Sequence, residues 1–134
     1  MQFTATYRPD ATTPITVTRW ATRLVAAAIL TIGLVPKFTG QAGALADVLP
    51  GGAPMVIGIG VIELIAVVLV LIPRTAVIGG GLATLIMAGA IVSHFGPVGF
   101  DGDFGAMFAM AVIALLAAAT AAWLEWDARG RRVL

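Results

Sequence analysis

The sequence contains no cysteine and few charged residues. Charged side chains make up 11% of its 134 residues, whereas soluble domains usually carry about a quarter. The absence of cysteine excludes disulfides, thiol nucleophiles, iron–sulfur ligation and thioether attachment of haem. The single histidine excludes a bis-histidine haem within one chain. A net charge of +1, with scattered basic residues, gives no electrostatic footprint for nucleic acid, so we expect no nucleic-acid partner.

Apolar residues are abundant instead, and they occur in long blocks. They make up 60% of the chain. A helix needs about 20 mostly apolar residues to cross a hydrocarbon core roughly 30 Å thick. Four stretches meet this requirement, at about 20–37, 54–72, 76–95 and 104–124. The sequence therefore predicts an all-α membrane protein, a four-helix transmembrane bundle. Residues 1–134 then form a single transmembrane domain, with a polar N-terminal segment (1–18) and a basic C-terminal tail (125–134).

Proline and glycine separate the predicted spans. Thr13 followed by Pro14 favours a helix that opens ahead of the first apolar stretch. The sequence LPGG at 49–52 is typical of a turn. Only residues 73–75 separate the second span from the third, which predicts a tight antiparallel helical hairpin.

The distribution of arginine predicts the orientation in the membrane. Arginines precede the first span, occupy the 73–75 connection and follow the last span, whereas the opposite side receives Lys37 as its one basic residue. The positive-inside rule then places both termini in the cytoplasm, and the three tryptophans fall at the same predicted interface. A secretory signal over 19–46 is the rival interpretation, but Lys37 would interrupt the approach to its cleavage site.

Small residues recur at helical spacing in the third and fourth spans. Lipid tails are as apolar as leucine, so membrane helices associate through close packing that small residues permit. The pattern predicts close helix contacts, either inside one chain or in a homo-oligomer; its members are Gly79, Gly80, Gly81, Ala83, Gly89 and Ser93 in the third span, and Ala114, Ala118 and Ala122 in the fourth.

Glu63 is the most informative residue, because it lies in the middle of the second span. An acidic residue at that depth costs roughly 2.5–3.5 kcal/mol on insertion scales, so it should face the bundle and either pair with a cation or stay protonated. Lys37 is its natural partner, and Gly33 and Gly60 leave room beside the two charges. With His94 they form a candidate intramembrane polar site. The alternatives are a structural ion pair that fixes helix register and a histidine that is merely interfacial.

These residues resemble the DoxX / DoxX-like family. The resemblance rests on an arginine ahead of the first span, Gly33-x-x-x-Lys37, Gly60-x-x-Glu63, a proline in the hairpin and Ala90-x-x-x-His94, and it covers about residues 19–124. It implies a bacterial inner-membrane four-helix protein with Lys37, Glu63 and His94 as the family's polar positions. Some relatives are subunits of membrane oxidoreductases, so a partner redox subunit and a bound quinone are implied, with no cofactor held within the chain itself.

Three functions compete at this stage. The first is an accessory or quinone-handling membrane subunit, in which Lys37 or His94 donates to a quinone carbonyl and Glu63 relays protons. This function predicts an apolar cleft that touches Glu63. The second is a small proton-coupled transporter that uses Glu63. The third is a structural anchor or assembly protein, which predicts a closed Lys37–Glu63 pair without a cavity. No catalytic residue and no metal ligand is assigned, and whether the chain is an enzyme stays open.

Overall fold

The fold is all-helical, with four helices long and apolar enough to cross a membrane. The computed structural model describes residues 13–130, and within this range it contains no strand. Its elements are α1 (Thr13–Phe38), α2 (Gly43–Val48), α3 (Gly52–Leu71), α4 (Ala76–His94) and α5 (Phe104–Gly130). All of these except the short α2 have the length and composition of a membrane span. The predicted four-helix architecture is therefore confirmed.

Two helices extend beyond the apolar stretches that predicted them. α1 begins at Thr13, ahead of the apolar stretch as the Thr13–Pro14 pair predicted, and α5 continues to Gly130 rather than ending near residue 124. Hydropathy marks only the part of a helix that lies in the hydrocarbon core. The helical hydrogen bonds of the backbone can continue into the polar interface, so the helix is longer than its apolar stretch. The sequence also gave no indication of α2, whose six residues lie in the predicted connection between the first two spans.

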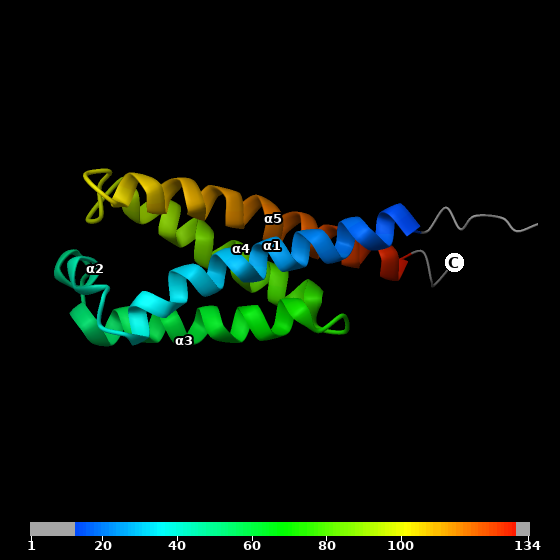
Figure 1. Ribbon diagram of the computed structural model, residues 1–134, viewed down its shortest axis with the longest axis horizontal. Helices are drawn as coiled ribbons and strands as arrows, with labels where there is room; N and C mark the ends of the chain where they lie inside the picture. Colours follow the sequence, from blue (N-terminus) through cyan, green and yellow to red (C-terminus); the bar gives the residue numbers. More distant parts are fainter. Residues whose placement is uncertain (1–12, 131–134) are drawn as a thin grey trace, which may run out of the picture.

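The four long helices form a ring, and α1 also makes a smaller contact with α4 across it. α1 contacts α3 and α5, and α4 contacts the same two helices from the opposite side. Figure 1 shows the start of α1, the α3–α4 connection and the last turns of α5 at one end, which we call the arginine end after Arg19, Arg74 and Arg129. The other end carries α2, the α4–α5 connection and Lys37; we call it the lysine end.

The interior of the bundle is built from small residues, and many large apolar side chains point outward. The fully buried positions include Ala26, Ala66, Ala83 and Ala114, while Leu85 is 72% exposed. In water such a surface would be an aggregation liability, but in lipid it meets acyl chains. This inverted distribution is what a membrane bundle requires.

At the arginine end, the backbone of α4 lies in close contact with the backbones of α3 and α5. A Cβ atom added to Gly79 would lie 2.3 Å from the backbone nitrogen of Val70 in α3, and one added to Gly80 would lie 2.8 Å from the carbonyl oxygen of Ala118 in α5. The predicted role of these two glycines in helix contacts is thus confirmed. Gly81 and Gly89 have nothing within 4 Å of such an atom, so they take no part in this packing.

Candidate functional site at the lysine end

Lys37 and Glu63 form a buried ion pair that joins the end of α1 to the middle of α3. The Lys37 Nζ lies 2.6 Å from Glu63 Oε2, and the two side chains are 8% and 5% exposed. Lys37 Nζ also donates to the carbonyl oxygen of Gly33 at 2.9 Å. The predicted pairing of these two charges is therefore present in the structure, and Gly33 takes part through its backbone.

Gly60 permits α1 and α3 to meet beside the ion pair. A Cβ atom at Gly60 would lie 3.2 Å from the Phe38 ring and 3.4 Å from the Cβ of Lys37. Gly60 is also three residues before Glu63, so the two residues share one face of α3. The absence of a side chain at Gly60 thus brings the lysine close enough to neutralise the glutamate.

His94 does not join this ion pair; it is bound by backbone carbonyls at the end of α4. Its Nδ1 lies 2.7 Å from the Ala90 oxygen and its Nε2 lies 3.0 Å from the Phe104 oxygen at the start of α5. A neutral imidazole can donate to only one of these carbonyls, whereas an imidazolium can donate to both. The rings of Phe100 and Phe108 flank it, with centroids 5.7 and 5.4 Å away. His94 therefore links α4 to α5.

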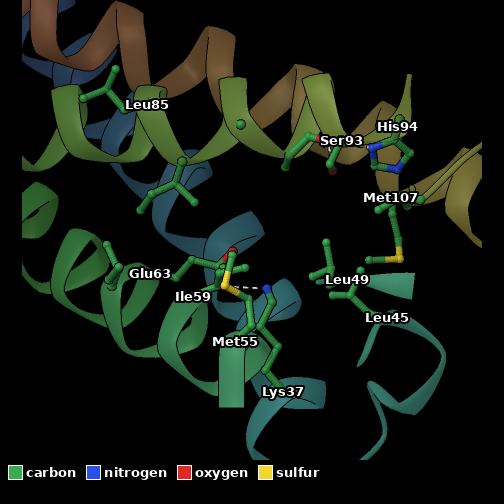
Figure 2. A pocket seen from close by; sticks show the side chains of 15 residues that line it. Lys37, Leu45, Leu49, Met55, Ile59, Glu63, Leu85, Ser93, His94 and Met107 are labelled. Carbon is green, nitrogen blue, oxygen red and sulfur yellow. Dashed lines mark hydrogen bonds and ion pairs between the residues drawn. The ribbon is translucent and has the colours of Figure 1, made fainter. Parts of the chain in front are cut away.

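A cavity of about 350 Å³ lies between α3 and α4 at the lysine end and touches all three predicted residues. Figure 2 shows Lys37 and Glu63 on one wall and His94 on the opposite wall. Most of the lining is apolar and comes from α2, α3, α4 and α5. Its other members are Leu45, Leu49, Met55, Ile59, Ile62, Leu85, Ile86, Gly89, Ala90, Ser93, Val98 and Met107.

The rim of this cavity faces the lipid. Met55 and Ile62 on α3 are exposed, as are Leu85 and Gly89 on α4, and all four line the cavity. The two helices are in close contact at Gly79, so they part toward the lysine end and leave an opening between apolar side chains.

A second, smaller cavity of about 100 Å³ shares Lys37, Glu63 and His94 with the first. It is bounded by α1, α3, α4 and α5, so the ion pair lines two spaces at this end of the bundle. Met107 lines both spaces. Methionine side chains are unbranched and adapt to ligands of different shape.

A further buried ion cluster lies at the arginine end. Glu125 accepts hydrogen bonds from Arg19 Nε at 2.7 Å and Arg19 Nη2 at 2.6 Å, and it also pairs with Arg23. In the sequence these arginines indicated the orientation and formed part of the family resemblance, and their pairing with Glu125 was not predicted. Two features of the sequence could have indicated the cluster: arginines one helical turn apart share a face, and Glu125 lies between two tryptophans at the end of an apolar run.

No protein-family model matches the chain, and neither a curated protein nor a solved structure shows significant similarity to it. The fold and the site define its class by themselves: a multi-pass four-helix membrane protein with a buried lysine–glutamate pair beside an apolar cavity.

Proposed function

We propose that the chain is a DoxX-like accessory subunit of a membrane oxidoreductase system, and that it binds a quinone of the bilayer in the cavity between α3 and α4. The observation that carries this proposal is the position of the Lys37–Glu63 pair in the wall of an apolar cavity whose rim faces lipid. A structural anchor requires only a closed pair, and the cavity beside the pair has no purpose in that function.

The residues of the cavity suit a quinone by size and by polarity. About 350 Å³ is within the usual range of small-molecule sites. An ammonium group carries three N–H donors, and Lys37 directs two of them at Glu63 and at Gly33. The third N–H donor of Lys37 is available to a carbonyl oxygen of a quinone bound in the cavity. The apolar ring and tail would then lie along Ile59, Ile62 and the other rim residues toward the lipid.

The chemistry of this chain would be limited to protons and positioning. A quinone accepts both electrons and protons when it is reduced. The electrons must come from a partner subunit, because a chain with no cysteine and only one histidine lacks the usual ligands of a redox centre. In the ion pair Glu63 is a carboxylate and Lys37 is an ammonium. Lys37 can donate its proton to a quinone oxygen on reduction, which leaves a neutral amine, and Glu63 can accept the replacing proton and return it to that amine. Both groups are shielded from water, so the proton stays in the site until the ligand takes it.

The proposed location is a bacterial inner membrane, with the arginine end in the cytoplasm. The basic residues Arg19, Arg23, Arg74 and Arg129 lie at that end, which is the end that the positive-inside rule retains in the cytoplasm. The cavity then opens into the outer half of the bilayer. A quinone bound there would meet a partner subunit on the outer side or within the membrane.

Binding of a short-tailed ubiquinone to the purified protein tests the proposal. Replacing Gly89 with phenylalanine fills the cavity from α4 and should weaken binding by at least about tenfold, because the ring would occupy the space that the ligand needs. Gly81→Phe is the matched control: it is on the same helix, lies outside the cavity lining and has no atom within 4 Å of its added Cβ. Equal affinities for Gly89→Phe and the wild type would refute the proposed site.

A further inference from the structure

A pocket of about 220 Å³ at the arginine end has no part in the proposed quinone site. It lies between the α3–α4 connection and the last turns of α5, and is lined by Arg19, Pro73, Arg74, Glu125, Ala128 and Arg129. Three arginines and one glutamate thus line a space large enough for a small anionic group. Such an excess of one charge in a concave site favours an anion.

The carboxylate in this pocket is already shared between two arginines. Glu125 holds Arg19 through both carboxylate oxygens and also pairs with Arg23. Arg23 is 2% exposed, and its Nε is buried with no hydrogen-bond partner in the part of the chain that the structure describes. Glu125 thus faces two guanidiniums, a buried one on Arg23 and a partly exposed one on Arg19, so its single carboxylate is already compensated and does not oppose an anion at the pocket.

The fourth arginine of this region is held in position at the pocket. Arg129 Nη2 donates to the carbonyl oxygen of Arg74 at 2.6 Å, which ties the end of α5 to the α3–α4 connection. A guanidinium has five N–H donors in a planar fork, so this bond leaves donors for a ligand. The same fork matches the geometry of a phosphate group.

The depth of the pocket identifies the source of the anion. Trp123 and Trp126 on α5 are 65% and 70% exposed, and they flank Glu125 in the sequence. Exposed tryptophans of membrane helices concentrate at the level of the lipid headgroups. We propose that this pocket binds the phosphate of an anionic phospholipid, with Arg74 and Arg129 as its direct ligands and Arg19 at its inner wall.

Native mass spectrometry of the detergent-solubilised protein tests this proposal. The protein is titrated with phosphatidylglycerol and, in parallel, with phosphatidylcholine of the same acyl chains. The wild type should retain one phosphatidylglycerol per chain in preference to phosphatidylcholine. The double variant R74Q/R129Q should lose affinity by about fivefold for each arginine removed, because each supplies one charge at the headgroup. R74Q alone keeps the carbonyl oxygen that Arg129 contacts and should show the smaller loss.

The matched variant R74K/R129K keeps both positive charges at the pocket and should retain phosphatidylglycerol more strongly than R74Q/R129Q. Equal retention of the two lipids by the wild type, or undiminished preference in a correctly folded R74Q/R129Q, would overturn the proposal. A third titration uses glycerol phosphate and reads thermal stability. Stabilisation as strong as that given by the lipid would mean that a soluble phosphate is the ligand, and this too would overturn the lipid site.

Discussion

At the scale of single residues, the ion pair was predictable because its charges are conspicuous. Glu63 is the one charged residue among the apolar residues 54–72, and Lys37 ends the preceding apolar stretch. Each needed a partner, and each was the other's nearest candidate. The pairing of Glu125 was not predicted, because the positive-inside rule alone accounts for arginines near a membrane interface and requires no acidic partner. The contact between His94 and the Phe104 oxygen could not be predicted, because it depends on how the α4–α5 connection folds back over the end of α4.

Substitution of the pair separates its structural contribution from its proposed role in binding. We expect Lys37→Met to destabilise the bundle by about 3–5 kcal/mol, because it leaves Glu63 buried without a cation. The double variant K37M/E63L replaces the pair by apolar side chains and should recover most of this loss. Unfolding by SDS in mixed micelles, followed by circular dichroism, measures both.

The double variant should nevertheless bind the quinone more weakly than the wild type, since it lacks the N–H donor at the depth of the cavity. If K37M/E63L were as unstable as K37M, the loss of stability would come from altered packing at residue 37, and the unpaired charge of Glu63 would not be its cause. If it bound quinone like the wild type, the polar groups would have no role in recognition.

At the scale of elements, α1 is fastened at both ends to different helices. Its first half pairs with α5 through Arg19 and Glu125, and its last turn pairs with α3 through Lys37 and Glu63. Figure 1 shows the resulting path, in which α1 crosses from the α5 side of the bundle to the α3 side. The spans were predictable from hydropathy, but this crossing was not, because it depends on which charges meet across the bundle.

Closure of the α3–α4 hairpin depends on Gly79. We expect Gly79→Ala to destabilise the fold by about 1–3 kcal/mol, because its Cβ would overlap the backbone of Val70 and Leu69 and force the helices apart. Gly81→Ala, two residues further along α4, adds the same methyl group to open space and gains helix propensity. It should leave the melting temperature unchanged or slightly raised.

Thermal unfolding in detergent, read by circular dichroism, compares the two alanine variants directly. Equal melting temperatures for Gly79→Ala and the wild type would show that the close backbone contact at the arginine end is not required for the fold.

At the scale of the whole molecule, α3 and α4 are closely packed at the arginine end of the bundle and separated by a cavity at the lysine end. Glycine contacts close the arginine end, whereas α3 and α4 diverge toward the lysine end and leave the cavity between them. The sequence predicted four spans from hydropathy. It predicted an apolar cleft beside Glu63 only as a consequence of the quinone-handling hypothesis. It could not predict the size of the cleft or its lipid-facing rim, because small residues such as Gly89 and Ser93 fit a packed interface and a cavity wall equally well.

We propose that a lipid-soluble quinone occupies the cavity beside the Lys37–Glu63 pair. Photolabelling tests it most directly: the protein in nanodiscs is irradiated with a photoactivatable short-tailed ubiquinone, and the labelled residues are mapped by mass spectrometry. A quinone in this cavity should be attached to residues within 55–63 of α3 and 85–94 of α4, and both excess ubiquinone and Gly89→Phe should prevent this labelling. Labels spread evenly over the lipid-facing surface, unaffected by competitor or by that substitution, would contradict it.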